Sequence, residues 1–178
     1  MHKLFHWFYG LPILYAVLLL LAATVIILFL RDKVGNTQHW KAGIAFLLLC
    51  WIVVIILGTL GRRTESETQI APILMPFYSY YIAHRDGQRE LLRANFMNIV
   101  LFYPAGLLSI QLLPKRWHAH GRIVPLVCAF VMLSIGIEHI QHHFSLGLAE
   151  VDDVIHNGLG ALLGTIAGRI PLLSNTQK

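Results

Sequence analysis

Six polar or ionisable side chains interrupt the hydrophobic final third of the chain and could carry chemistry. They are Glu138, Gln141, His142, Asp152, Asp153 and Asn157. Ionisable groups at membrane depth are costly, and those that occur commonly serve a function. The hydrophobic runs before Glu138 and after Asp153 are long enough to be membrane spans, so the polar residues end one helix and begin the next. Both helix ends then lie at one membrane face, where we expect a single site.

Two carboxylates at one membrane face could act as catalytic groups. Glu138 and Asp153 are the candidate pair, because each heads a stripe that must face protein rather than lipid. Carboxylates held close together repel, so one of them keeps a proton at neutral pH unless a cation lies between them. Arg62 and Arg63 end the second hydrophobic run at the same level and are candidate cations.

A divalent metal ion is another candidate cation for this site. Its candidate ligands are Glu138, His142, Asp152 and Asp153. A ligand set rich in carboxylates with one imidazole favours magnesium or manganese over zinc. The spacing matches no zinc signature, and His142 is better explained as an interfacial side chain than as a metal ligand. We therefore leave the metal and any other cofactor unassigned.

Structural roles account for the same acids without chemistry. Glu138 could form an ion pair with Arg62 or Arg63 inside a helix bundle, since structural ion pairs are common in such positions. Asp152 could simply cap the last helix, where an acid favours the positive end of the helix dipole.

Amide side chains lie at the same predicted face. Asn98, Gln141 and Asn157 are the binding residues that we predict, together with Arg62 and Arg63. The amides could instead join neighbouring helices through hydrogen bonds worth about 0.6 kcal/mol each.

Composition indicates a polytopic membrane protein. Of the 178 residues, 56% are hydrophobic and 13% are charged, against about 25% charged in soluble domains. The net charge of +5 comes from bases at run ends and in loops, where they orient membrane helices, and no basic recognition helix supports nucleic-acid binding. Cys50 and Cys128 lie within hydrophobic runs without paired spacing, which disfavours a disulfide or zinc site. Membrane lipids are therefore expected partners, and nucleic acid is not.

Five hydrophobic runs predict an all-α polytopic bundle of about five transmembrane helices. They cover residues 11–30, 42–60, 95–113, 123–140 and 153–173. The first run has twenty residues, the length that a helix rising about 1.5 Å per residue needs to cross about 30 Å of hydrocarbon. It continues into a charged segment without a cleavage site, so we interpret it as an uncleaved helix. Pro104 should kink the third helix.

Glycines follow the polar residues along the last run. Gly160 and Gly164 continue the stripe that begins at Asp153, and Gly106 follows Asn98 on one face of the third run. Positions three and four apart share a helix face, and glycine lets two membrane helices approach closely. We predict that Gly160 and Gly164 form a structural packing seam beneath the polar site and face another helix at close range, and that Gly106 also has a structural role.

The interval between the second and third runs is not uniformly polar. Residues 70–84 combine two prolines with several aromatics, which favours a segment lying in the membrane interface. Arg85, Arg89 and Arg93 follow, and we expect them to form a solvated or headgroup-facing surface.

Basic residues in the short loops indicate the orientation. The segments 31–41 and 114–122 carry three Lys or Arg residues each, whereas the loop 141–152 carries none and is acidic. The positive-inside rule therefore places the N-terminus and the polar cluster outside the plasma membrane. We divide the chain into an N-terminal two-span region, residues 1–58, and a membrane domain, residues 59–173.

Five motifs occur in order between residues 59 and 168. They are TLGRR from Thr59, MPFYSY from Met75, NIVLFYPAGLL from Asn98, S-x-x-x-E-x-x-Q from Ser134 and VDDVIHNGLGALLG from Val151. Their combination resembles the VanZ-like membrane proteins, named for a teicoplanin-resistance protein. By this resemblance, family motif positions are occupied by Asn98, Pro104, Gly106, Glu138, Gln141, Asp153, Asn157, Gly160 and Gly164.

Two functions from different classes follow. The resemblance implies a non-enzymatic factor of the bacterial cell envelope that reduces glycopeptide action at the cell surface, with a cell-wall precursor or the antibiotic as its partner. The polar cluster alone suggests a membrane-interface enzyme, a metal-assisted hydrolase or transferase acting on a lipid-linked polar substrate. One isosteric change, such as Glu138→Gln or Asp153→Asn, should abolish a catalytic site but not a scaffold.

Overall fold

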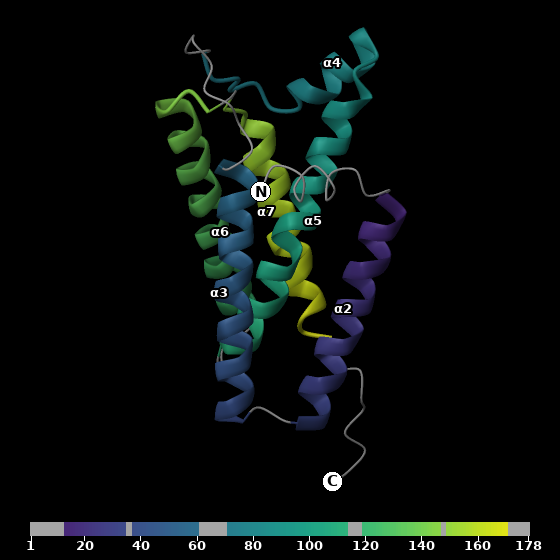
Figure 1. Ribbon diagram of the computed structural model, residues 1–178, viewed down its shortest axis with the longest axis vertical. Helices are drawn as coiled ribbons and strands as arrows, with labels where there is room; N and C mark the ends of the chain where they lie inside the picture. The colour runs from purple at the N-terminus through teal and green to yellow at the C-terminus, as the bar shows by residue number, and fades with distance from the viewer. Residues whose placement is uncertain (1–12, 35–36, 61–70, 114–118, 147–148, 171–178) are drawn as a thin grey trace.

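The apolar runs form long helices that lie side by side and leave one short helix at an end of the bundle (Figure 1). The computed structural model describes residues 13–34, 37–60, 71–113, 119–146 and 149–170. In order, the helices are α2 (Ile13–Val34), α3 (Gln38–Leu60), α4 (Tyr78–Asp86), α5 (Arg89–Leu112), α6 (Ala119–His143) and α7 (Val151–Ala167). The described residues contain no strand, and the predicted all-α membrane bundle is confirmed.

Three of these helices are long and apolar enough to cross a membrane. They are Gln38–Leu60, Arg89–Leu112 and the part of α6 from Ile123 to His143. α2 has 22 residues and α7 has 17, so α7 is about 25 Å long, a little less than the hydrocarbon thickness of about 30 Å. The count of five spans stays a prediction.

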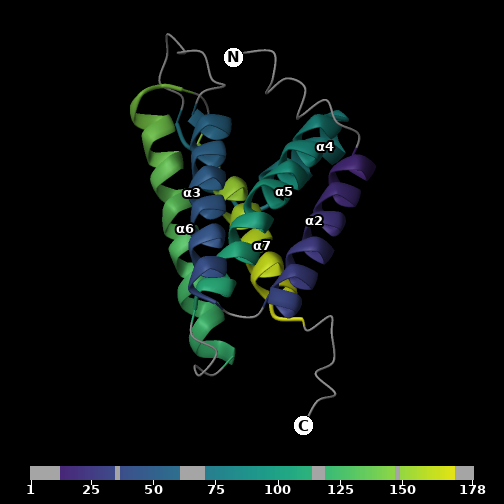
Figure 2. The same ribbon diagram turned by 60° about the horizontal axis from the view of Figure 1, so that its bottom comes forward.

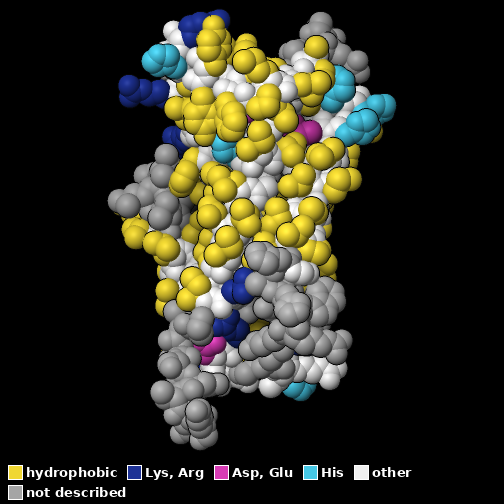
Figure 3. All heavy atoms as spheres, turned by 180° about the vertical axis from the view of Figure 1, so that it is seen from behind, with side chains coloured by type: hydrophobic (Ala, Val, Ile, Leu, Met, Phe, Trp, Pro, Cys, Tyr) yellow, Lys and Arg dark blue, Asp and Glu magenta, His cyan; other side chains and the backbone are white. Residues whose placement is uncertain are grey.

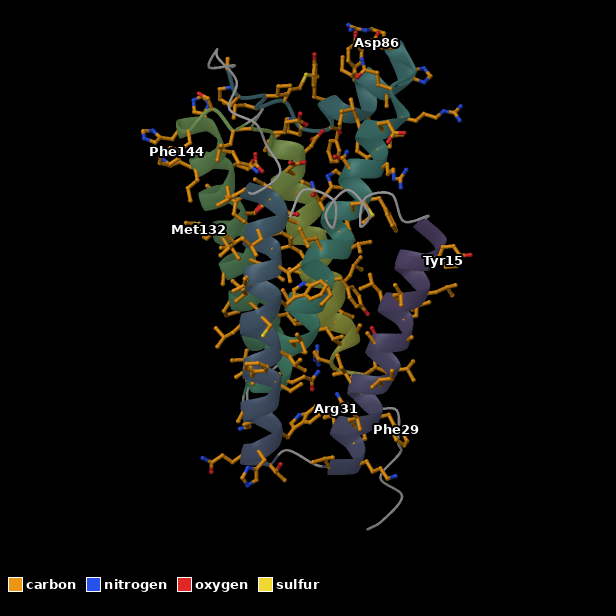
Figure 4. The ribbon with its side chains drawn as sticks, viewed as in Figure 1. Tyr15, Phe29, Arg31, Asp86, Met132 and Phe144 are labelled. Carbon is orange, nitrogen blue, oxygen red and sulfur yellow. The ribbon has the colours of Figure 1, made fainter. Side chains whose placement is uncertain are left out.

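Apolar side chains along the outer helices face outward. Tyr15 and Phe29 on α2 and Met132 on α6 point away from the other helices (Figure 4). Seen from behind, hydrophobic side chains cover the middle, while basic and histidine side chains gather near the ends (Figure 3). This distribution is typical of helices whose outer faces contact lipid.

α5 is the central helix of the bundle. Its most hydrophobic stretch is 56% buried, against 17% for α3 and 22% for the corresponding part of α6. The turned view places α5 and α7 between α3 and α6 on one side and α2 on the other (Figure 2). Pro104 lies inside α5, which nevertheless continues to Leu112.

Glycines allow the backbones of α5 and α7 to approach each other very closely. A Cβ atom at Gly164 would lie 1.9 Å from the carbonyl oxygen of Tyr103, and one at Gly106 would lie 2.1 Å from that of Ala161. At Gly160 the nearest atom would be a carbonyl oxygen of α5, at 2.4 Å. The structure therefore places the glycine stripe of α7 against α5, where any side chain would separate the two backbones.

Aromatic packing and two hydrogen bonds join the remaining helices to α5. Phe102 on α5 meets Phe130 on α6 edge to face, with ring centroids 6.4 Å apart. The indole of Trp51 on α3 donates to the Leu101 carbonyl at 2.8 Å, and the hydroxyls of Thr24 on α2 and Tyr103 on α5 lie 2.9 Å apart.

The lower end of α7 is held by an arginine from α2. Arg31 is 9% exposed, and its guanidinium donates to the carbonyls of Gly168 and Ile170 at 2.8 Å each. Figure 4 shows it at the lower end of the bundle. The α7 helix ends at Ala167, earlier than the predicted limit of residue 173. Gly168 follows the helix and Pro171 comes soon after in the sequence, and a proline cannot continue a helix; residues 171–173 lie outside the described part.

Candidate functional site

Four helices bring their polar ends to the same end of the bundle, drawn at the top of Figure 1 and called here the upper end. α3 and α6 finish there, and α5 and α7 begin there. Residues 71–77 cross this end and lead into α4. The polar residues of the sequence motifs are therefore gathered at one end of the molecule.

The carboxylate of Asp152 holds the start of α4. Its side chain is buried, with 1% of the residue exposed. One oxygen accepts the backbone N–H of Phe77 at 2.5 Å, and the other accepts the backbone N–H of Ser79 at 2.9 Å and its hydroxyl at 2.5 Å. Phe77, with φ 61°, has no capping side chain of its own. Asp152 thus supplies from α7 the anion that a helix N-terminus favours.

This interaction corrects one of the structural roles considered above. α7 begins after Glu150, with no side-chain hydrogen bond at its cap, so Asp152 does not cap its own helix. It lies one residue inside α7, and its carboxylate reaches across to α4 because both of its oxygens find N–H or O–H donors there.

A chain of hydrogen bonds extends from Asp152 into α5 and α4. Asn95 on α5 donates to the Ser79 hydroxyl at 2.6 Å. The Nδ1 of His156 lies 2.5 Å from the Asp152 carbonyl, and its Nε2 lies 2.9 Å from the Tyr80 hydroxyl. A carbonyl only accepts, so Nδ1 is the protonated nitrogen. The Tyr80 and His156 rings also stack, at 5.8 Å between centroids.

The segment before α4 is fastened to the start of α7. Ile73 forms a parallel bridge with Glu150, in which its N–H donates to the Ala149 carbonyl at 2.9 Å and its carbonyl accepts from Val151 at 3.0 Å. With the Asp152 bonds, this bridge fixes residues 73–79 across the upper end of the bundle.

The predicted catalytic pair lies at this end, on α6 and α7. Glu138 is 8% exposed and accepts the backbone N–H of Glu150 at 3.0 Å. The Asp153 carboxylate accepts from the Asn98 amide at 2.7 Å, and its backbone N–H donates to the Glu150 carbonyl at 3.2 Å. Both acids therefore hold the start of α7, while the close approach of their carboxyl groups stays a prediction.

The other predicted binding residues join helices. Gln141 on α6 donates to the carbonyl of Thr59 on α3 at 3.0 Å, and Asn157 on α7 donates to the hydroxyl of Ser134 on α6 at 2.9 Å. Both amides are 2% exposed. Arg62 and Arg63 lie outside the described residues.

The described residues do not gather metal ligands. In the part of the chain that the structure describes, no three His, Cys, Asp or Glu side chains are grouped so that they could hold a metal ion. Of the four candidate ligands, Asp152 already uses both carboxylate oxygens on α4. His142 is half-buried, and its neighbour His143 packs against His139 and the outward-facing Phe144 (Figure 4).

Three buried members of the site were not predicted from the sequence: Ser79, Asn95 and His156. His156 lies four residues after Asp152, a helical spacing that places both on one face of α7, and this signal could have identified it. Ser79 and Asn95 join the site only through the fold, since each meets a residue that is distant in sequence.

Comparison with known proteins gives one match. A family model described as VanZ/LLP1 matches residues 44–172, from the first third of α3 to just beyond the described end of α7. No curated protein and no solved structure matches the chain. The family match covers most of the sequence and includes every helix that contributes to the upper-end site, so the chain is a membrane protein that belongs to the VanZ/LLP1 family.

Proposed function

We propose that this protein lowers the action of teicoplanin-type glycopeptides at the bacterial cell surface, as a non-catalytic component of the plasma membrane. Its upper end faces outward and interacts with the antibiotic or with the cell-wall precursor that the antibiotic binds. Membership of the VanZ/LLP1 family supports this function.

One observation carries the proposal: the buried acids of the upper end stabilise an exposed apolar surface. Asp152 holds α4, and Glu138 holds the residue that pairs with Ile73. The surface that these contacts support consists of Leu74, Met75, Phe77, Tyr80 and Tyr81, which are 75%, 59%, 57%, 45% and 52% exposed. Such a mixture of aromatic and aliphatic groups favours the boundary between headgroups and water, where lipid-linked precursors present their polar parts.

The chemistry of the buried acids also favours a scaffold over an enzyme. A general acid or base must reach the proton that it transfers, whereas Asp152 has both oxygens engaged by α4. The neighbouring amides join helices in the same way. These groups are better suited to fixing the shape of the upper end than to reacting with a substrate.

The experiment compares drug susceptibility and drug binding. The full chain and its variants are expressed in a teicoplanin-sensitive bacterium, and the inhibitory concentration and the cell-bound amount of fluorescent teicoplanin are measured at matched protein levels. We expect expression to raise the inhibitory concentration and reduce binding, and Tyr81→Ser with Phe77→Ser to remove both effects. Met132→Ala, on the outward face of α6, is the control and should retain them.

Two outcomes would refute the proposal. One is unchanged teicoplanin susceptibility and binding upon expression. The other is complete loss of the phenotype in Glu138→Gln or Asp153→Asn at normal protein level and unfolding temperature, because that result identifies a reacting carboxylate. Orientation is checked with Ser145→Cys in a chain lacking Cys50 and Cys128: labelling by a membrane-impermeant thiol reagent only after cell lysis would place the upper end inside.

A further inference from the structure

Two exposed histidines stack on α6 close to its upper end, apart from the buried acids. His139 and His143 are four residues apart, a spacing that places both on one face of the helix. Their rings are nearly parallel, with an interplanar angle of 17° and centroids 6.4 Å apart. The ring of Phe144, which Figure 4 shows on the outward side of this helix end, packs edge to face against His143 at 4.9 Å. The helix end therefore presents two imidazoles side by side.

The nitrogens of both imidazoles are available to a ligand. Among the described residues, none forms a hydrogen bond or an ion pair with His139 or His143. The buried His156, in contrast, has both nitrogens engaged, by the Asp152 carbonyl and the Tyr80 hydroxyl. A neutral imidazole carries one nitrogen lone pair that can coordinate a metal ion. The stacked pair thus offers two such lone pairs from one helix face.

The backbone beneath the pair is firmly held. The helical hydrogen-bond pattern continues past His143, since the N–H of Phe144 donates to the Ile140 carbonyl at 3.0 Å. Within the same stretch of α6, Gln141 donates to a carbonyl of α3 at 3.0 Å. Two ligands on one fixed backbone lose little further freedom when they bind a single ion, so the second bond forms at a high effective concentration.

A metal ion fits between the two side chains after a small rotation. Two metal–nitrogen bonds of about 2.0–2.1 Å at a tetrahedral angle place the coordinating nitrogens about 3.4 Å apart. Exposed side chains rotate readily, on the picosecond to nanosecond timescale. The same four-residue spacing supplies two histidine ligands in the H-E-x-x-H motif of zinc proteases. Ile140 stands where that motif has its glutamate, so this pair has the ligand spacing without the catalytic acid.

Ligand type and position select the ion. Imidazole suits copper, zinc and nickel, whereas magnesium, calcium and manganese favour carboxylate and carbonyl oxygens. Among the divalent ions of the first transition row, Cu²⁺ has the highest affinity for such ligands. The pair also lies at the C-terminal end of α6, where the helix dipole favours a positive charge.

From these features we infer that His139 and His143 together bind a late first-row transition-metal ion, Cu²⁺ most tightly, with water in the remaining positions. In the described part of the chain, no third His, Cys, Asp or Glu side chain completes a group with this pair. The site differs from the carboxylate-rich one predicted around Asp152 and Asp153. It is independent of the glycopeptide function and holds whether or not that function does.

The test titrates Cu²⁺ into the full chain in phosphatidylcholine nanodiscs, purified without a histidine tag. All samples carry Cys50→Ser, Cys128→Ser and His2→Gln, which remove thiols and a histidine that could bind Cu²⁺ together with the terminal amine. Electron spin echo envelope modulation counts the imidazoles on the bound ion. We expect one tight equivalent with two imidazoles. His139→Gln and His143→Gln should each weaken binding at least tenfold and leave a single-imidazole signal, because either change removes the chelate.

His142→Gln is the matched control. It removes the neighbouring, half-buried histidine, and we expect Cu²⁺ affinity within twofold of the parent chain and an unchanged two-imidazole signal. Without metal, the variants at the two exposed positions should unfold at the temperature of the parent, so a lost site is not mistaken for a lost fold. A single imidazole in the parent, or a loss below tenfold in either His139→Gln or His143→Gln, would mean adventitious surface binding and overturn the site. An equal loss in His142→Gln would overturn the assignment of this pair.

Discussion

The close contact between α5 and α7 at Gly164 predicts that a single added methyl group there will cause a large loss of stability. In Gly164→Ala, the added Cβ would lie 1.9 Å from the Tyr103 carbonyl oxygen and 2.9 Å from the Leu107 nitrogen. Both neighbours are backbone atoms of α5, so no side chain can rotate away to make room. The two helices must separate, or α7 must turn about its axis.

The geometry sets the size of the effect. Real Cβ atoms essentially never come closer than 3.0 Å to such neighbours, so the Tyr103 oxygen must move by at least 1.1 Å, the difference between 3.0 and 1.9 Å. Overpacking of this kind typically costs about 1–3 kcal/mol, and a backbone contact belongs at the upper end of that range. For a chain of this length, about 3 kcal/mol corresponds to a melting temperature roughly 6–12 °C lower.

The assay is thermal unfolding of the protein in lipid nanodiscs, followed by circular dichroism at 222 nm. Gly136→Ala on α6 is the control, because nothing lies within 4 Å of its added Cβ. Alanine is favoured over glycine within a helix by about 0.5–1 kcal/mol, so this variant should melt at the same temperature as the unmodified protein or slightly above it. Gly158→Ala, whose Cβ meets only a Val131 methyl at 3.0 Å, should lie between.

The ranking makes the reasoning refutable. The distances predict that Gly164→Ala is the least stable variant, followed by Gly106→Ala at 2.1 Å and Gly160→Ala at 2.4 Å. If Gly164→Ala has the same melting temperature as Gly136→Ala, α5 and α7 do not approach as closely as described. A large loss in Gly136→Ala would instead mean that glycine itself, rather than proximity, is required.

Three further predictions concern the ends of the helices. Asp152→Asn should destabilise the protein by about 2–3 kcal/mol, because it weakens charge-assisted bonds, and should speed hydrogen exchange in α4 measured by mass spectrometry. Asp153→Asn, whose side chain accepts from Asn98 on α5, should leave α4 protected. Arg31→Gln should lower the melting temperature by removing the donors to the Gly168 and Ile170 carbonyls that follow α7, and Arg31→Lys should recover part of the loss. In Arg85→Gln the pKa of Asp86, followed by NMR titration, should rise towards its ordinary value; any stabilisation from this pair is therefore present above that ordinary value and lost as pH falls through the lowered pKa.

Local periodicity was sufficient to predict most of the helices and the common end of the polar residues. A hydrophobic run of about twenty residues is long enough to predict a membrane-spanning helix. Because successive spans cross the membrane in opposite directions, their order also predicts which helix ends lie at the same face. Gly160 and Gly164 were recognised because four-residue spacing places them on one face. Their partner helix, α5, could not be identified in this way, because helical spacing describes one helix at a time.

The contacts of the upper end join residues that are distant in the chain, and no local pattern indicated most of them. α4 begins at Tyr78, and Phe77 before it has a side chain that cannot cap a helix; the cap comes instead from Asp152, 75 residues after Phe77. Arg31 was assigned to a loop from its charge, yet it is 9% exposed and bonded to α7. In both cases a charged side chain forms hydrogen bonds with backbone groups that are distant in the sequence. Composition alone cannot identify those backbone groups.

The shortness of α7 explains why so many polar side chains converge on its ends. A helix of 17 residues is about 25 Å long, so if α7 is the fifth predicted span its terminal N–H and C=O groups would lie near the hydrocarbon boundary, where unpaired backbone groups are costly. Water is scarce there, and the protein must supply the partners.

Partners from four other segments meet this requirement. At the upper end, Glu138 accepts from Glu150 and the Ile73 carbonyl accepts from the first residue of α7. At the lower end, Arg31 and Gln111 donate to the Gly168 carbonyl. The buried polar groups that distinguish this sequence therefore have a structural reason independent of any reaction. Activity should be sought on the surface that they leave exposed, which consists of Leu74, Met75, Phe77, Tyr80 and Tyr81.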